Sequence, residues 1–420
     1  MSGFRYFDTW RRVVKSEMLD AKAKETGLQK RRRGKLTGPR LFWACVLGGR
    51  AEARRTMAGL ARAASLYSGE KVSRQGFHQR LTREAATFMQ GAFEHVQQQA
   101  LTMTGDPLPG ILGKFDDINA IDSTTVRLAD LLAKRYPACR SNVRKAALKI
   151  HAQMSLTDKQ VERLRLTAER VHDRKGMVEI GPWVRNRLLL YDLGYADYQL
   201  IQEVVHHGGA VLTRLKDSAN GTIVGVRRGC AKRHIGRELN GPICDDAVVD
   251  IDVRFGHGEH AVVLRVVGLW DYERKAFHWY ITSLSPTEFS AEDLAQIYRL
   301  RWQIELLFKM WKSLCRLDQL PSEKETVILC LLYASLCAAL LARIASWLAA
   351  RSYGIPWHQM CASTALNILG QYTLTLGRAI LQRWRSRYRK ALADLLDLLA
   401  EHARLPNRTN AVLAFADGPR

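Results

Sequence analysis

Alternation of apolar and polar residues predicts β-strands from about residue 107 onward. The segment 118–126 is rich in β-branched residues, and apolar and polar positions alternate at 146–156 and 161–168, as expected of strands with one buried face. The elements predicted next are a buried strand at 187–191 (RLLLY), a helix at 196–207 and a strand at 210–215. Three consecutive strands followed by strand, helix and strand predict a mixed sheet covered by helices.

The chain after this unit is predicted to form a second β-rich segment and then helices. Residues 222–283 are again strand-like, with the runs AVVDIDVRF, AVVLRVVGLW and AFHWYITSL, and they predict an all-β insertion. Ser290 to Leu314 is predicted to be one long helix, and the chain from Glu323 onward is mainly helical.

Two helices are predicted before the strands, at 56–67 and 73–82, joined by a turn that contains Gly69. Ser73 stands where a helix N-cap is expected. The second helix bears Arg74 and His78, so the pair is compatible with a helix-turn-helix that reads DNA. An ordinary helical hairpin shows the same pattern, and both readings remain open.

An apolar run from Val327 to Ala342, extended beyond Arg343, has two readings. A membrane span needs about 20 uncharged apolar residues. The internal Arg343 and the cationic flanks favour a buried core helix instead.

Charge narrows the class of partner. The 420 residues include 64 Lys plus Arg against 41 Asp plus Glu, a formal net charge of +23, which argues for a polyanion. Nucleic acid is favoured over an anionic membrane. The first 57 residues are strongly basic, peaking at Lys30–Lys35, and are predicted to be a flexible, phosphate-seeking arm. The eight cysteines form no Cys-x-x-Cys pair, which fits a reducing cytoplasm.

The predicted helix at 290–314 carries a polar face with an unusual composition. At about 100° per residue, its members fall within an arc of about 60°. They are Tyr298, Arg301, Glu305 and Lys312, with Lys309 flanking them. A solvated amphipathic face with i,i+4 ion pairs would look the same on geometry alone.

The spacing of these residues resembles a known signature. Tyr298-x2-Arg301-x3-Glu305-x6-Lys312 is similar to the Y-R-E-K motif of a branch of D-D-E transposases from bacterial insertion sequences. Four such residues at fixed spacings should occur by chance in about one chain of this length in several hundred. The resemblance implies that Glu305 is the third catalytic acid and that Tyr298, Arg301 and Lys312 hold phosphates at the transposon end.

A catalytic Glu of this kind needs two Asp partners on the sheet. Asp122 lies inside the first predicted strand, and Asp192 follows the fourth in the sequence YDLGY, which resembles the family's D-x-G-Y box. Each alone has an ordinary structural reading, because Asp is favoured in turns and also caps strands. The interval between Asp192 and Glu305 is where the family carries a β-rich insertion, and residues 222–283 have that composition.

Carboxylates suit this chemistry because Mg²⁺ prefers hard oxygen ligands. Asp122, Asp192 and Glu305 are therefore predicted to hold two Mg²⁺ ions per active site, with Mn²⁺ as an alternative. Two such ions can serve the attacking and leaving oxygens of an in-line displacement.

Three further residues are candidates for DNA contact. Trp279 has a setting similar to that of the family's base-stacking Trp, although a core Trp on a strand reads equally well. Arg214 and Lys216 follow the fifth strand and are either phosphate ligands or ordinary surface cations.

The sequence is thus identified as resembling a bacterial transposase with a ribonuclease-H-like core. The predicted regions are a DNA-end-binding region (1–110), a catalytic core (111–221 and 285–320), the β-rich insertion (222–284) and C-terminal helices (321–420). The expected partners are double-stranded DNA with terminal inverted repeats, target DNA and a second copy of the chain, with no membrane, in the bacterial nucleoid. The alternatives are a nuclease of the same fold without strand transfer and a non-catalytic DNA-binding protein.

Overall fold

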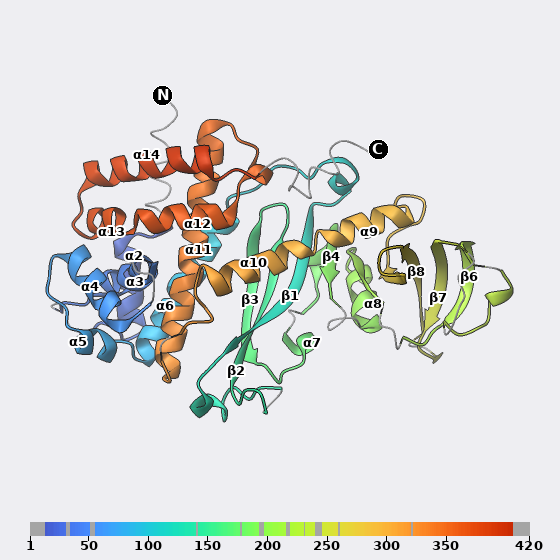
Figure 1. Ribbon diagram of the computed structural model, residues 1–420, viewed down its shortest axis with the longest axis horizontal. Coiled ribbons are helices and arrows are strands. Elements are labelled where there is room, and N and C mark those ends of the chain that lie inside the picture. The colour runs from blue at the N-terminus through green and yellow to red at the C-terminus, as the bar shows by residue number, and fades with distance from the viewer. Residues whose placement is uncertain are drawn as a thin grey trace.

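A mixed sheet in the middle of the molecule joins a helical bundle at one end to a β-rich lobe at the other (Figure 1). The computed structural model describes residues 13–30, 34–50, 55–139, 142–176, 179–192, 197–215, 219–230, 232–239, 246–258, 261–320 and 322–405. The first and last helices share the same bundle (Figure 1). The division of the chain into the five predicted regions stays a prediction.

Nine strands form one continuous sheet in the order β3-β2-β1-β4-β5-β9-β8-β7-β6. Their bounds are β1 Asp117–Arg127, β2 Ala147–Ser155, β3 Gln160–Ala168, β4 Arg187–Tyr191, β5 Ala210–Arg214, β6 Thr222–Arg228, β7 Val248–Phe255, β8 Val262–Asp271 and β9 Ala276–Thr282. β1, β4 and β5 are parallel neighbours, and the other pairs are antiparallel. The five strands predicted before residue 216 are confirmed.

The insertion is joined to the core sheet by backbone pairing. β9 pairs antiparallel with β5, with Leu212 opposite Thr282 and Arg214 opposite Tyr280. The edge of β5 would otherwise present unpaired backbone groups, and β9 satisfies them. Strands β6 to β9 therefore extend the core sheet.

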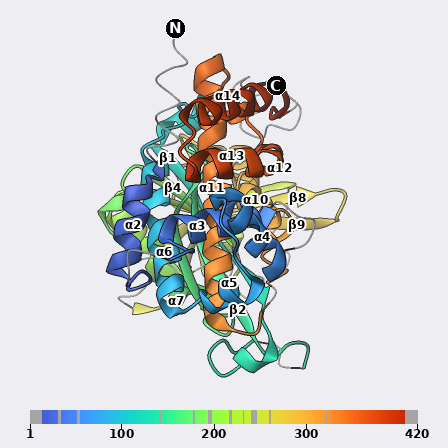
Figure 2. The same cartoon turned by 90° about the vertical axis from the view of Figure 1, so that its left-hand side faces the viewer.

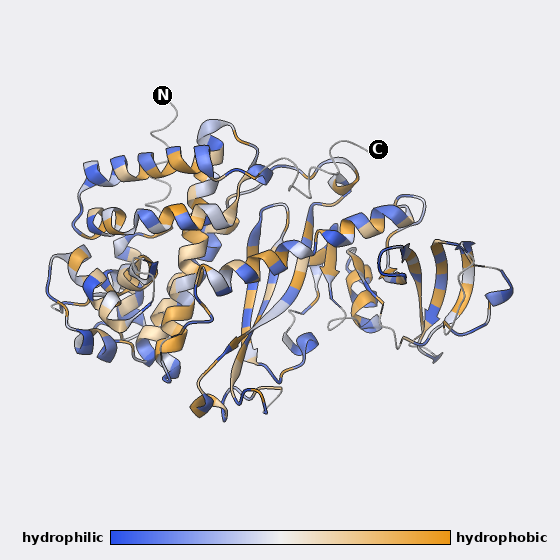
Figure 3. Cartoon of the chain, in the orientation of Figure 1, coloured by the Kyte–Doolittle hydropathy of each residue, from blue (hydrophilic) through white to orange (hydrophobic). Residues whose placement is uncertain are grey.

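Each face of the sheet packs against its own helices. The central helices are α7 Asp173–Gly176, α8 Tyr198–His206, α9 Ala291–Arg299 and α10 Trp302–Ser313. Hydropathy alternates along β1 to β3 and β6 to β8 (Figure 3), as alternate side chains point to opposite faces. Ile118 and Ala120 join the core beneath α9 and α10, whereas Ile121 joins a second core with Ile201 of α8.

The described residues of the basic N-terminal region are mainly helical. Its helices are α2 Ser16–Glu25, α3 Gly38–Val46, α4 Met57–Ser68, α5 Arg74–Gln79 and α6 Arg83–Leu101. The flexible-arm prediction is wrong for α2 and α3, because apolar side chains such as Leu19, Phe42 and Trp43 are buried in the bundle. Arg31, Arg32 and Arg33 lie outside the described residues.

The predicted helix pair around Gly69 is present as α4 and α5. Ser73 accepts a hydrogen bond from the Gly76 amide as the N-cap of α5, and Gly69 ends α4 in the left-handed region with φ of 75°, where glycine is favoured. Phe77 is buried while Arg74 and Gln75 face solvent. Whether this pair reads DNA stays a prediction.

The long apolar segment forms a helix through the middle of the bundle. The C-terminal helices are α11 Glu325–Tyr353, α12 Ala362–Gln371, α13 Thr373–Leu381 and α14 Arg385–His402. α11 is long and apolar enough to cross a membrane, but 89% of its most apolar window is buried inside the protein. It packs against α3, α6, α12 and α14 (Figure 2), as a core helix does.

Candidate active site

The predicted helix at 290–314 is two helices with a break at Leu300 and Arg301. A capping box between Ser290 and Asp293 begins α9. At the break, the amides of Leu300, Arg301, Gln303 and Ile304 each bond to the carbonyl three residues earlier. The prediction of one uninterrupted helix is therefore wrong, since the backbone tightens here into the 3₁₀ pattern often found at functional sites.

The register of β1 and β4 brings Asp122 and Asp192 together. Ile121 lies opposite Tyr191, the last residue of β4. Asp122 and Asp192 follow this pair, and the charge of Asp192 is near enough to act on Asp122. Side-chain alternation turns Asp122 towards the face that α10 covers, where Leu190 also lies. Two of the three predicted acids therefore lie beside each other on one face of the sheet.

Arg301 links Glu305 to this pair. Its Nη1 donates to Asp122 Oδ2 at 3.2 Å, and its Nη2 donates to Glu305 Oε1 at 2.5 Å. The side chains of Arg301, Asp122 and Glu305 are 13%, 20% and 30% exposed. In the described part of the chain, no three His, Cys, Asp or Glu side chains are grouped closely enough to hold a metal ion. The guanidinium instead serves as the shared counter-ion of two predicted metal ligands.

The electrostatics of Asp122 reflect burial and crowding. Burial raises the pKa of Asp122 to about 6, and the negative charges of Asp192 and Glu305 act in the same direction. The Ser123 amide, which donates to Asp122 Oδ1 at 2.7 Å, and the charge of Arg301 oppose that rise. A partly buried carboxylate group of this kind is stabilised by cations.

Tyr298 anchors α9 to the sheet. It is 8% exposed, its hydroxyl donates to the Tyr191 carbonyl at 3.4 Å, and its ring lies edge-on to Tyr280 of β9 at 5.3 Å. The Arg301 guanidinium lies 5.6 Å from the centre of the Tyr298 ring. Tyr298 thus fixes the helix that presents Arg301.

The other predicted cations differ in their surroundings. Arg214 lies opposite Tyr280 in the sheet and within electrostatic reach of Tyr298. Lys309 is exposed on α10, and Lys312 is half-buried. Burial, together with the nearby charge of Arg144, lowers the pKa of Lys312. Lys216 lies outside the described residues.

Trp279 lies on the other face of the sheet from the three acids. It is half-buried in the second core, where its ring stacks on Phe277 and covers Gly268 of β8. Its neighbour Tyr280 points towards α9 instead. Base stacking by Trp279 stays a prediction, and this placement favours a packing role.

Sequence reasoning did not single out Tyr280 and Arg265, which contact α9 or the segment before it, or Arg144, whose charge acts on Lys312 of α10. Strand alternation separates Tyr280 from Trp279, but it does not say which of the two faces the helix. That choice depends on how β9 pairs with β5.

The three carboxylates suit a divalent ion by donor type, since all are hard oxygen ligands. Asp122 and Glu305 already converge on a single cation, Arg301. The residues present are therefore chemically fit to hold Mg²⁺.

Comparison with known families decides the wider identity of the chain. The family model described as "Transposase DDE domain" matches residues 113–341, which is more than half of the 420 residues. The chain belongs to the DDE transposase family.

Two relatives are similar in sequence over most of the length of this transposase. It is 22% identical to the transposase for insertion sequence element IS231B of Bacillus thuringiensis subsp. berliner, over 94% of this chain and 91% of that protein. It is also 22% identical to the IS231D transposase of Bacillus thuringiensis subsp. finitimus, over 77% and 76% of the two chains. A shorter stretch of 77 residues is 44% identical to the putative transposase InsL of IS186A from Escherichia coli strain K12, covering 18% and 21%.

A solved structure shares the fold. The piggyBac transposase in its synaptic complex with hairpin DNA aligns with a TM-score of 0.52 and 11% identity, over 96% of this chain and 86% of that one. The mixed sheet with flanking helices is the predicted ribonuclease-H-like fold. The protein is a DNA transposase, and membership of this family implies dependence on a divalent metal ion.

Proposed function

We propose that Asp122, Asp192 and Glu305 are the catalytic acids of this transposase and hold two Mg²⁺ ions, with Mn²⁺ as an alternative. The observation that carries the proposal is that Arg301 joins the carboxylates of Asp122 and Glu305, with the charge of Asp192 near enough to act on Asp122. When bound, such ions supply charge stabilisation and a nucleophile activated at neutral pH.

The reaction proposed is in-line phosphoryl transfer in two stages. Water attacks a phosphodiester at the end of the element, the P–O3′ bond breaks, and a 3′-OH is released. That 3′-OH then attacks a phosphodiester of target DNA, which forms a new P–O bond and displaces another 3′-oxygen. An attack across the duplex to give a hairpin is the second route open to the same 3′-OH.

The cations around the acids would bind the DNA backbone. Arg301 would release its carboxylate partners and take a phosphate instead, because a guanidinium binds both groups in a bidentate manner. We propose Lys309, Lys312, Arg214 and Lys216 as further contacts to DNA phosphates. Tyr298 would act by holding α9, since its side chain is buried.

The substrate proposed is double-stranded DNA with terminal inverted repeats, bound by a homodimer on paired ends in the bacterial nucleoid. The basic N-terminal helices are the proposed end-binding region. Footprinting on DNA that flanks the reading frame tests this, with protection of short inverted repeats as the expected result.

A strand-transfer assay tests the reaction itself. With pre-nicked ends, Mg²⁺ and a target plasmid, joined products are expected, and Asp192→Asn should remove them while leaving DNA binding intact. Cleavage without joined products would support a nuclease instead. Unimpaired joining by the variant would remove Asp192 from the site.

A further inference from the structure

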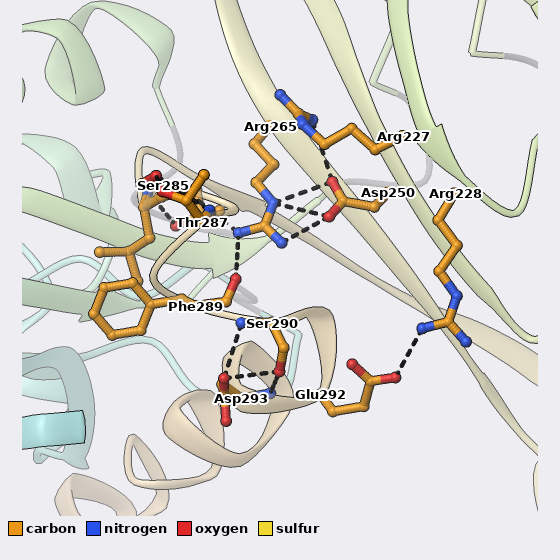
Figure 4. Close-up of polar contacts among 12 residues, drawn as sticks. Arg227, Arg228, Asp250, Arg265, Ser285, Thr287, Phe289, Ser290, Glu292 and Asp293 are labelled. Carbon is orange, nitrogen blue, oxygen red and sulfur yellow. Dashed lines mark hydrogen bonds and ion pairs between the residues drawn. The ribbon is translucent and has the colours of Figure 1, made fainter. Parts of the chain in front are cut away.

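One buried guanidinium on the insertion fastens the start of the catalytic helix pair. Arg265 of β8 is 5% exposed, and its Nε and Nη2 donate to the Asp250 carboxylate of β7 at 2.7 to 3.2 Å. Its Nη1 donates to the carbonyls of Phe289 at 2.8 Å and Leu284 at 3.4 Å (Figure 4). Asp250 thus orients the Arg265 guanidinium so that Nη1 donates to main-chain carbonyls.

The two carbonyls lie at the two ends of the crossover from β9 to α9. Leu284 follows β9, and its amide donates to Thr282 Oγ1, while Phe289 precedes the N-cap Ser290. The first and last residues of the segment 284–289 are therefore both hydrogen-bonded to the Arg265 side chain. Because the capping box follows at once (Figure 4), Arg265 sets where α9 starts.

The position of α9 matters to the acids at its far end. α9 lies over β5, β7 and β8, and α10 lies over β1, so the helix that leads to the break at Arg301 rests largely on the insertion. Tyr298 holds its last turn, and Arg301, two residues beyond its end, bonds to Asp122. A shift at the start of α9 would displace the break at Arg301, whose side chain bonds to Glu305 of α10.

Stability alone does not explain a buried pair of this kind. Burying two charges costs roughly as much free energy as their attraction returns, and an apolar pair of similar volume often stabilises a core more. An Arg fork also offers directional bonds that Lys does not reproduce. We therefore infer that the Arg265–Asp250 pair serves to fix the direction of the bonds to Leu284 and Phe289.

We propose that Arg265, oriented by Asp250, is a positioning residue through which the β-rich insertion holds α9, and with it Glu305, in register with Asp122 and Asp192. The proposal rests on the catalytic role of Glu305 proposed above. It gives the insertion a task in forming the active site, in addition to any contact with DNA.

The chain offers two matched controls. Arg228 of β6 also bridges the insertion to α9, through Glu292 at 3.2 Å (Figure 4), but both side chains are 52% exposed, where solvent screens the pair. Val266 is the next residue on β8, fully buried on the opposite face, so Val266→Ala should weaken the fold without touching the crossover.

The test is single-turnover cleavage of end DNA at saturating protein, beside the DNA dissociation constant and thermal unfolding. Arg265→Lys should slow cleavage of bound DNA by about 10- to 100-fold, with the dissociation constant within about twofold of wild type. Arg228→Ala and Val266→Ala should cleave at the wild-type rate per folded molecule. Hydrogen exchange of the amides at 290–294 should quicken in Arg265→Lys and not in Val266→Ala.

Two results would overturn the proposal. The first is wild-type cleavage by Arg265→Lys, and the second is a slowing that Val266→Ala matches at equal loss of thermal stability. If Arg265→Lys does not fold, Asp250→Asn serves in its place, because the amide oxygen still accepts one bond from Arg265. Failure of the catalytic assignment is distinguished by Glu305→Gln, which would then cleave normally whatever Arg265→Lys does.

Discussion

The two faces of β1 each bury a group of carboxylates around one arginine, and only one of these groups resembles an active site. Asp117 and Asp122 are five residues apart on the strand, so they point to opposite faces. Asp117 lies with Glu162 and Arg187, and Asp122 lies with Glu305 and Arg301. Burial raises the pKa of both aspartates to about 6, so a raised pKa does not tell the groups apart.

The difference lies in the donors. Asp117 accepts hydrogen bonds from the Ile118 and Thr157 amides and from the side chains of Ser155 and Asn119. Glu162 accepts from Asn119 and Gln153 as well as Arg187. These donors lie mainly on adjacent strands, where the ladder holds them in place.

The carboxylates near Arg301 depend on fewer groups. Asp122 accepts from its neighbour's amide and from Arg301, and Glu305 is held by Arg301 at the break between two helices. A rotation of the Arg301 side chain alone would break its bonds to both Asp122 and Glu305. From this comparison we expect a buried acidic group to be available for chemistry where its charge is paired with a replaceable cation, and to be structural where neutral donors already satisfy it.

The first prediction compares the replacement of Glu305 by glutamine with the same replacement of Glu162. Glu305→Gln should reduce Mg²⁺-dependent cleavage of end DNA by about 10³-fold or more, because several kcal/mol of transition-state stabilisation are lost. Glu162→Gln should cleave normally per folded molecule and lose about 1–3 kcal/mol of stability, since a charged acceptor is removed. Single-turnover cleavage and urea unfolding measure the two effects. Equal loss of cleavage in both variants would show that the two groups do not differ in role.

The second prediction concerns the effect of pH on stability through Asp117. The pKa of Asp117 is raised from 3.8 to about 6, chiefly by burial, so between these values the folded state keeps a proton that the unfolded state has released. The free energy of unfolding should therefore fall as pH rises through this window, by about 3 kcal/mol for this residue at about 1.4 kcal/mol per pKa unit.

Asp117→Asn removes that titration and no other, so the difference between wild type and variant isolates it from Asp122. Urea unfolding at pH 4 and pH 7 measures the difference. A wild-type stability that did not fall relative to the variant would mean that the carboxylate is stabilised by its hydrogen bonds as fully as it is in water.

Much of the fold was predictable because local pattern and tertiary structure agree in the core. RLLLY predicts β4 at its observed bounds, since a strand buried on both faces reads as a continuous apolar run. The turn and N-cap at Gly69 and Ser73 follow from backbone and capping chemistry that acts within a few residues.

What the sequence could not predict depends on contacts between distant segments. The helix break at Arg301 has neither Pro nor Gly to announce it. The continuation of the sheet from β5 to β9 joins residues about 70 apart, and no local pattern specifies that pairing. Asp122 was predicted through resemblance, and nothing in its local sequence sets it apart from Asp117, because the difference between them lies in partners from β2, β3 and α10.

The last comparison is between the two arginines, and it predicts the smallest effect. Arg301 is proposed to exchange its carboxylates for a DNA phosphate, so Arg301→Ala should weaken end binding by about tenfold and reduce the slope of log affinity against log salt by about 1. Arg187 donates to Glu162 and Asn119 and pairs with Asp117, and it is not proposed to contact DNA, so Arg187→Ala should lower stability and leave the salt slope unchanged. Fluorescence anisotropy of labelled end DNA across a salt series measures both slopes. An unchanged slope for Arg301→Ala would mean that its guanidinium stays with the acids when DNA binds, and the two faces of β1 would then differ in their acids alone.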